Sequence, residues 1–253
     1  MQPRDALREA LTLDDRPALV SFFTAGYPDR DRFLAVLEEV CSASDAVEIG
    51  VPFTDPMADG VTVQRSSEAA LSNGVSLSWI FGELAAREFE LPAPILLMSY
   101  LNPLYAFGFD RLADRALETG VSGFIVPDLP FEESGPLKAA LDEKGIALVQ
   151  LVTPATPADR LEKLCGVSQG FVYAVTHTGI TGASNGLSTD ISGYLAAVKK
   201  ASSLPVCAGF GVRERSQVAQ IAEHADGVVV GSALLEALES GTSPGSFLES
   251  LRL

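Results

Sequence analysis

The 253-residue sequence predicts an α/β fold, a single (β/α)8 barrel that spans residues 1–253 and carries a short extra helix at its N-terminus. Short apolar segments of strand character alternate with segments of helical periodicity, which implies a parallel sheet with helical crossovers. Eight strand–helix units in about 250 residues match the closed TIM barrel. The alternative, an open doubly wound sheet, requires a Gly-x-Gly-x-x-Gly turn after its first strand, where Gly26 stands alone. No linker or change in composition interrupts the alternation, so we expect one domain.

The first half of the chain is expected to supply a closing helix and four strand–helix units. Residues 6–13 are amphipathic and predict the short N-terminal helix. Residues 100–108 are expected to form a loop. The predicted strands are residues 18–24, 46–51, 94–99 and 123–126, and apolar residues at helical spacing predict helices that begin near Phe33, Val61, Leu77 and Phe109.

The second half repeats the pattern four more times. A long loop rich in Gly, Ser and Thr covers residues 176–188, and one final helix is expected after Ser232. The predicted strands are residues 146–152, 171–175, 205–208 and 227–230, and the other predicted helices contain Leu137, residues 157–165, Ile191 and Val218.

Composition excludes several classes of function. The formal net charge of −15 argues against nucleic acid, whose binding depends on clustered Lys and Arg. No apolar run reaches about 18 residues, so no membrane span is expected, and the N-terminus lacks the apolar core of a signal peptide. Cys41, Cys165 and Cys207 are odd in number and far apart, which fits reduced, buried thiols in a cytoplasmic protein. Two histidines make a metal site unexpected.

Residues 47–60 combine a strand with a stiff loop. Glu48 lies inside the apolar run of the second predicted strand, and parallel strands are usually buried on both faces. Burial raises the pKa of a carboxyl group unless a cation compensates, and a raised pKa suits a general acid or base. A structural glutamate in a buried network is the alternative. Pro52 and Pro56 stiffen the loop that presents Asp59, so the stretch predicts a site with two carboxylates.

In a TIM barrel the active site is built by the loops at the C-terminal ends of the strands. Asp128 could bind a ligand there or cap a turn, and Tyr173 could pack in the core or aim its hydroxyl into the mouth. His177 could contact a ligand from the long loop or be a surface histidine. The residues that this rule gathers at the mouth are Phe22, Glu48, Asp59, Tyr100, Asp128, Tyr173, Thr181 and Phe210.

Three glycine turns follow the last three predicted strands, at residues 179–182 and 209–211 and at the pair Gly231 and Ser232. Glycine lets backbone N–H groups approach an anion, and a helix N-terminus favours negative charge. TIM barrels often bind a phosphate at the loops after strands seven and eight. Because the turns contain no Lys or Arg, we expect the backbone and Ser232 to hold the phosphate. Plain turn chemistry is the alternative.

These residues resemble the family of tryptophan synthase α subunits. The resemblance follows the chain in order over nearly its whole length. The segment from Glu48 to Gly60 is its most specific part, and the glycine turns are much less specific. The other matching segments are residues 22–28, 100–102, 128–134, 178–183 and 209–211 and the pair Gly231 and Ser232.

The resemblance implies a lyase of L-tryptophan biosynthesis that cleaves indole-3-glycerol phosphate, in a retro-aldol reaction, to indole and glyceraldehyde 3-phosphate. It makes Glu48 the general acid/base. Asp59, expected to stay ionised on its polar loop, becomes the partner of the indole N–H. The implied substrate-binding residues are Phe22, Tyr100, Ile125, Leu151, Tyr173, Thr181 and Phe210, and the implied phosphate-binding residues are Gly182, Gly211, Gly231 and Ser232.

The resemblance also implies a partner. It places no cofactor on this chain and assigns pyridoxal phosphate to a β subunit in an α2β2 assembly. Asp55, Pro56 and residues 100–108 are expected to form the docking face. The loop around Thr181 would close over the substrate, and His177 stands where some relatives carry arginine.

Three other functions compete with this interpretation. Phosphate-sugar isomerases of amino-acid biosynthesis share the phosphate turns but need carboxylates on strands one and five, and here strand five offers only Gln150. A non-catalytic phosphate-binding barrel would not need both Glu48 and Asp59. A free-standing lyase that releases indole without a β partner fits the same residues.

Overall fold

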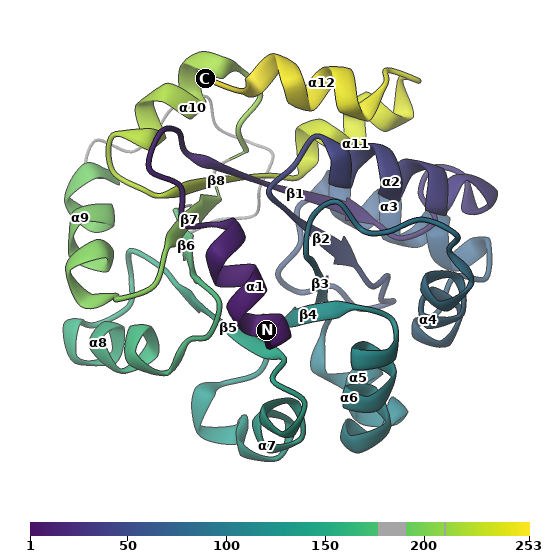
Figure 1. Ribbon diagram of the computed structural model, residues 1–253, viewed down its shortest axis with the longest axis horizontal. Coiled ribbons are helices and arrows are strands. Elements are labelled where there is room, and N and C mark those ends of the chain that lie inside the picture. The colour runs from purple at the N-terminus through teal and green to yellow at the C-terminus, as the bar shows by residue number, and fades with distance from the viewer. Residues whose placement is uncertain (177–190, 210) are drawn as a thin grey trace.

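The computed structural model describes residues 1–176, 191–209 and 211–253. Eight parallel strands form a closed barrel in sequence order, which confirms the predicted TIM barrel (Figure 1). The barrel closes where β1 pairs with β8, with Ser21 opposite Val230. The strands are β1 (Ala18–Thr24), β2 (Ala46–Gly50), β3 (Ile95–Met98), β4 (Val121–Ile125), β5 (Ala147–Val152), β6 (Val172–Val175), β7 (Val206–Gly209) and β8 (Gly227–Val230).

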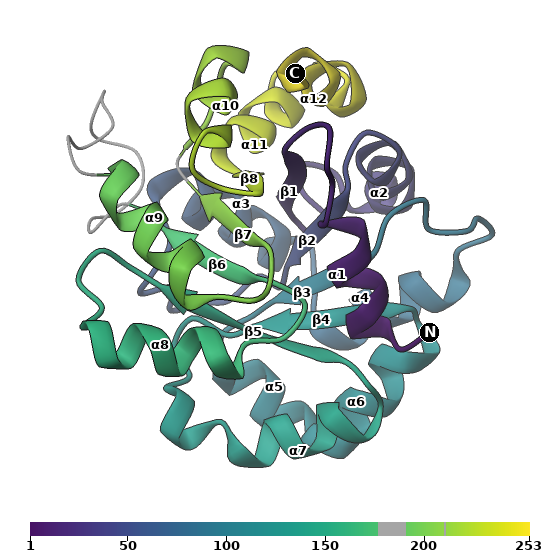
Figure 2. The ribbon, with the colours of Figure 1, turned by 60° about the vertical axis from the view of Figure 1, so that its left-hand side comes forward.

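Helices surround the barrel, and one helix closes its end. In Figure 1, α1 lies over the centre of the barrel, inside the ring of the other helices. Figure 2 shows α8 and α9 packed together along the side of the barrel that contains β5 and β6. The helices are α1 (Pro3–Ala10), α2 (Phe33–Ser42), α3 (Val61–Ser72), α4 (Leu77–Ala86), α5 (Leu101–Phe107), α6 (Phe109–Glu118), α7 (Gly135–Glu143), α8 (Ala158–Val167), α9 (Ile191–Ala201), α10 (Arg215–Ala222), α11 (Ser232–Glu239) and α12 (Pro244–Leu251).

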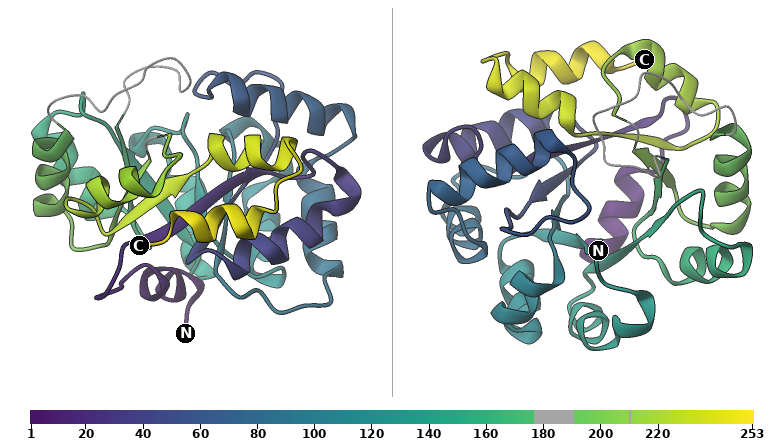
Figure 3. Two further views of the ribbon diagram at one scale, coloured as in Figure 1. Left: turned by 90° about the horizontal axis from the view of Figure 1, so that it is seen from above. Right: turned by 180° about the vertical axis from the view of Figure 1, so that it is seen from behind.

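Each strand contributes to two apolar cores, because successive side chains of a strand point to opposite faces. The outer core packs the strands against the helices. The inner core fills the barrel, and α1 closes it at the end opposite the active-site mouth (Figure 3). The inner core includes Leu7 of α1 and Leu11, which follows that helix, together with Val20, Leu96, Ile125 and Val149 from four strands and Phe171, which precedes β6.

The structure corrects three sequence predictions. Residues 100–108 contain α5 instead of a loop, because Pro103 lies in the first helical turn, where its missing N–H is not needed. The chain ends with two helices instead of one: the side chain of Ser243 accepts a hydrogen bond from the N–H of Ser246, at 3.2 Å, and starts α12. Helix α1 begins at Pro3, ahead of the predicted start at residue 6.

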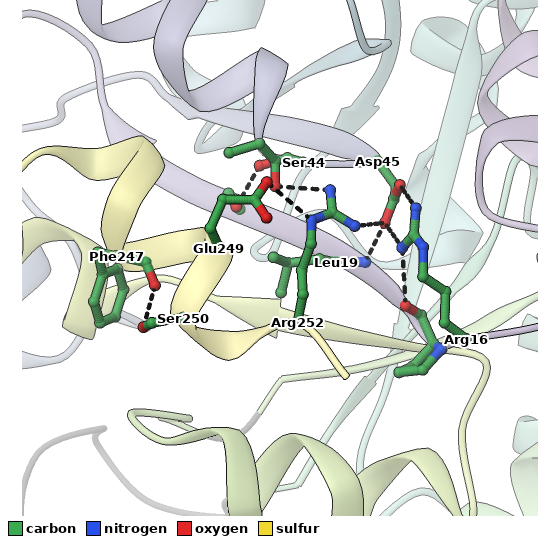
Figure 4. Close-up of polar contacts among 11 residues, drawn as sticks. Arg16, Leu19, Ser44, Asp45, Phe247, Glu249, Ser250 and Arg252 are labelled. Atoms are coloured by element: carbon green, nitrogen blue, oxygen red, sulfur yellow. Dashed lines mark hydrogen bonds and ion pairs between the residues drawn. The ribbon is translucent and has the colours of Figure 1, made fainter.

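A cluster of charged side chains ties the C-terminus to the first two strands (Figure 4). Two nitrogen atoms of Arg16 donate to the two carboxylate oxygens of Asp45, at 2.6 and 2.7 Å, and Arg252 Nη1 lies 3.5 Å from Asp45 Oδ2. Burial alone would raise the pKa of Asp45, but the hydrogen bond from Arg16 lowers it below its ordinary value.

Among the described residues, no helix is long and apolar enough to cross a membrane.

Candidate active site

Strand β2 places Glu48 inside the barrel. Val47 and Ile49 pack into the outer core and Ala46 into the inner core, so Glu48 shares the inward face of the strand with Ala46. The side chain is fully buried, and no described residue hydrogen-bonds to either carboxylate oxygen. Burial raises the pKa of Glu48 to about 8. A carboxyl group with this pKa is protonated at neutral pH and can both give and take a proton.

Tyr173 and Cys207 share the barrel interior with Glu48. They are opposite each other on β6 and β7. Burial raises the pKa of each group well above its ordinary value, and the charge of Glu48 raises both further. A Cβ atom on Gly209 would lie 2.6 Å from the Tyr173 hydroxyl oxygen, so this glycine leaves the space into which the hydroxyl points.

The loop between β2 and α3 brings Asp59 to the barrel mouth. Asp59, Phe22 and Tyr100 line a small cavity there. The hydroxyl of Tyr100 accepts a hydrogen bond from the N–H of Ala58 at 2.9 Å, and its ring lies 5.3 Å from that of Phe53. Burial raises the pKa of Asp59, and the Tyr100 hydroxyl lowers it in part. The surroundings of Asp59 are therefore less polar than the sequence predicts.

Asp128 has a structural role among the described residues. Its Oδ1 atom accepts a hydrogen bond from the N–H of Leu101 at 2.8 Å. Leu101 is the first residue of α5, and the first N–H groups of a helix have no partner within the helix. Asp128 thus caps α5 from the loop after β4, and this role favours the capping alternative over ligand binding. The capped helix precedes Asp128 in the sequence, whereas the sequence predicts a cap on the following turn.

The predicted apolar lining comes from four different strands. Ile125 belongs to the inner core, and Leu151 and Tyr173 pack against it. The Phe22 ring covers two glycines: a Cβ atom on Gly50 would lie 2.7 Å from it, and one on Gly231 would lie 3.3 Å from it.

One of the three glycine turns and part of a second lie within the described residues. Gly231 precedes α11 as its N-cap, and Ser232 is the first helical residue. Gly211 has a φ of +63°, and no described atom lies within 4 Å of the place where a Cβ atom would project. Arg213, just after this turn, pairs with Glu236 of α11. Four predicted residues, His177, Thr181, Gly182 and Phe210, lie outside the described residues.

Sequence reasoning missed two contacts of the site. The first is the position of Cys207 close to Glu48, and the second is the Asp128–Leu101 hydrogen bond. The strict alternation of inward and outward residues on β7 could have indicated the first. Among the described residues, no group of three His, Cys, Asp or Glu side chains could hold a metal ion.

The raised pKa of Glu48 predicts how stability depends on pH. The ordinary pKa of this group is 4.5, and in the folded protein it is about 8. Between these values the folded state holds a proton that the unfolded state releases, so the free energy of unfolding falls as pH rises. Glu48→Gln stays neutral at every pH. We expect its melting temperature to match that of the wild type near pH 4.5 and to exceed it increasingly up to pH 8. Thermal unfolding across this range measures the difference; a constant offset would contradict the assignment.

Comparisons with known proteins agree with this geometry. The family model described as tryptophan synthase alpha chain matches residues 9–249. The tryptophan synthase alpha chain of Desulfovibrio desulfuricans is 46% identical over 236 residues, which cover 92% of each chain. Tryptophan synthase of Mycobacterium tuberculosis superposes with a TM-score of 0.87 at 35% identity, covering 98% of this chain and 95% of that one. Subunit alpha of Legionella pneumophila gives 0.87 at 31% identity, covering 99% and 97%. The chain therefore belongs to the tryptophan synthase alpha chain family.

Proposed function

We propose that Glu48 and Asp59 together perform the reaction of this family. The chain is a lyase that converts indole-3-glycerol phosphate to indole and glyceraldehyde 3-phosphate in tryptophan biosynthesis. The alpha chain family uses no cofactor, and pyridoxal phosphate belongs to the β subunit. The observation that supports the proposal most is a fully buried carboxyl group, Glu48, on the strand whose last residue, Gly50, lines the same cavity as Asp59.

Glu48 would move the protons. Cleavage of the bond between indole C3 and the first side-chain carbon needs a proton on C3 and the loss of a proton from the hydroxyl on that carbon. With a pKa of about 8, Glu48 starts protonated and can donate to C3. The resulting carboxylate can then accept the hydroxyl proton as the aldehyde forms, which restores the starting state. We propose that Tyr173 orients the reacting groups beside it.

Asp59 would stabilise charge on the indole ring. Protonation at C3 develops positive charge that the ring nitrogen shares, and a fixed carboxylate in a water-poor site stabilises such charge strongly. Asp59 lies at the mouth, on a loop that Tyr100 holds through Ala58. Phe22, Tyr100, Ile125 and Leu151 would contact the indole ring, together with Thr181 and Phe210 from the undescribed residues.

We propose that the phosphate binds at Gly211, Gly231 and Ser232, together with Gly182. Valine at position 211 would have to adopt a left-handed backbone conformation, which costs roughly 1–2 kcal/mol, and it would fill the open space. We expect Gly211→Val to weaken glycerol 3-phosphate binding about tenfold or more, while indole affinity changes much less. Gly241→Val is the matched control, because Gly241 also has a positive φ, of +76°, and open space, but follows α11 away from the mouth. Equal losses in the two variants would contradict the phosphate site.

We also propose that this chain assembles with a β subunit into an α2β2 complex. Solved structures similar to this chain include tryptophan synthase from M. tuberculosis, consistent with a β-subunit partner. Met57, Val61 and Tyr105 are 78%, 65% and 71% exposed. They lie on the Asp59 loop, at the start of α3 and on α5, and exposed apolar groups mark an interaction surface where they form one patch. We propose that this surface docks the β subunit, with Asp55 and Pro56 at its edge.

Indole release tests the reaction and the partner together. Purified chain should release indole from indole-3-glycerol phosphate, and a matched β subunit should raise turnover about 5–150-fold, the usual range of such coupling. We expect Asp55→Ala to reduce this activation without changing the basal rate. An unchanged rate, with no complex by sizing chromatography at micromolar concentration, would favour the free-standing lyase.

We also propose a domain structure and a cellular location for this chain. We propose that residues 1–253 form one domain, because the family model matches nearly all of the chain. A cytoplasmic location is supported by Cys41, Cys165 and Cys207, which are all buried free thiols.

A further inference from the structure

We propose that this chain has a second small-molecule site, outside the barrel wall, which takes a neutral aromatic carboxamide or a ligand with the same paired donor and acceptor. The site is a cavity of about 300 Å³ between the loop after β4, strand β5 and α8. It shares only Pro127 with the small cavity at the active-site mouth. Of the described residues that we propose contact the substrate, only Leu151 also lines it.

Gln150 is the polar group that defines this site. It alternates on β5 with Val149 and Leu151 of the barrel interior, so its side chain projects outward into the cavity. The residue is 9% exposed, and no described residue hydrogen-bonds to its side-chain amide. Its backbone N–H, by contrast, donates to Ser168 Oγ at 2.9 Å. The donor and acceptor of the amide are therefore available to a molecule in the cavity, which indicates a ligand there.

The chemistry of Gln150 selects the polar part of that ligand. A carboxamide carries a C=O acceptor and an N–H donor side by side. A ligand that carries the same pair can therefore form two parallel hydrogen bonds with it. A carboxamide or a lactam meets this requirement, whereas a ketone or an ether supplies only an acceptor.

The cavity walls select an aromatic body. Ligand pockets usually measure about 300–1,000 Å³ and are mainly apolar, so this cavity suits a single ring with a small substituent. Aromatic and aliphatic side chains line it on three sides. These are Val126, Leu129 and Phe131 from the loop after β4, Leu148 from β5 and Leu164 from α8.

The charges at the rim favour a neutral ligand. Asp128 already accepts a hydrogen bond from the N–H of Leu101. Arg160 donates two hydrogen bonds to Glu132, at 2.8 and 3.1 Å, and this contact lowers the pKa of Glu132 to about 2. Because Arg160 is already paired with Glu132, an anionic ligand would lose hydration without gaining a free counter-charge.

Titration with 4-fluorobenzamide, followed by fluorine NMR, tests the site. We expect saturable binding below about 10 mM, unaffected by saturating indole-3-propanol phosphate, a substrate analogue without the side-chain hydroxyls. The ketone 4-fluoroacetophenone, which lacks the N–H donor, should bind at least tenfold more weakly. Absence of saturable binding, or displacement of the amide by the analogue, would overturn the proposal.

Two variants locate the binding, and a third controls for stability. Gln150→Leu should weaken 4-fluorobenzamide at least tenfold and keep the melting temperature, because no described residue hydrogen-bonds to the amide that it removes. Leu164→Phe should also weaken the amide, by filling the cavity while Gln150 stays in place. Gln169→Leu is the matched control: Gln169 accepts from the N–H of Leu148 at 2.9 Å and donates to Asp142 at 2.7 Å. It should lose stability but keep ligand affinity. Unchanged affinity in both Gln150→Leu and Leu164→Phe would refute the site.

Discussion

Replacing Glu48 with glutamine is expected to lower turnover of indole-3-glycerol phosphate by ~10²-fold or more, the usual scale of general acid–base catalysis. Glutamine keeps the shape of the side chain but cannot release and regain a proton. No described residue hydrogen-bonds to the Glu48 carboxylate, so replacing it with the glutamine amide breaks no described hydrogen bond. The loss should therefore appear in kcat, with folding intact.

Single-turnover release of indole, with circular dichroism as a check on folding, measures this effect. Glu48→Asp is the companion variant, because it keeps a titrating group but withdraws it by one methylene, and it should retain more activity than the glutamine. In the wild type, kcat/KM should fall as pH rises through about 8, since the acid that protonates C3 is lost there. Turnover of Glu48→Gln within about threefold of the wild type would remove Glu48 from the mechanism.

Asp59→Asn is expected to cost about 10²–10³-fold in turnover, the range for loss of one preorganised electrostatic group. Asparagine preserves the size of the side chain and its place on the loop but removes the negative charge that we propose faces the indole nitrogen. Burial around Asp59, which raises its pKa, also makes that charge more effective once the substrate is bound. The phosphate site is distant in sequence and should be largely unaffected.

Asp55→Asn provides the control for this experiment. Asp55 belongs to the same loop but is exposed, and without a β subunit its substitution should leave turnover near that of the wild type. Indole release and the affinity for glycerol 3-phosphate should be measured for both variants. If Asp59→Asn lost phosphate affinity in proportion to turnover, a general collapse of the loop would explain the result instead.

The barrel and its central carboxyl group follow from local patterns. Every strand is a short apolar run, and the two-residue period of a strand assigns Glu48 to one face as soon as the run is identified. The glutamate also contrasts with its apolar neighbours, so its burial and raised pKa could be expected from sequence. The proposed roles of both carboxylates come from the family resemblance and await the experiments above.

The missed features depend on how distant segments meet. Asp128 reaches Leu101, and Cys207 approaches Glu48, because the closed barrel brings together segments that are far apart in the sequence. The cavity at Gln150 depends on how far α8 stands from β5, which no pattern in either segment encodes. Helix α5 contains Pro103, and proline usually breaks a helix. It is tolerated here because it lies in the first helical turn, which the sequence alone does not show.

The barrel can close only after its C-terminal strand has been synthesised. Arg252 donates a hydrogen bond to the carbonyl oxygen of Ala43, at 2.8 Å and across 209 residues of sequence, and β1 pairs with β8. Ribosomes add about 5–20 residues per second, so the first strand waits roughly 10–40 s for its last neighbour. Throughout that interval one edge of β1 is unpaired, and such an edge is a template for strands of other chains. The nascent chain is thus the aggregation-exposed form of this protein, and ribosome-bound chains that end before β8 should depend most on chaperones.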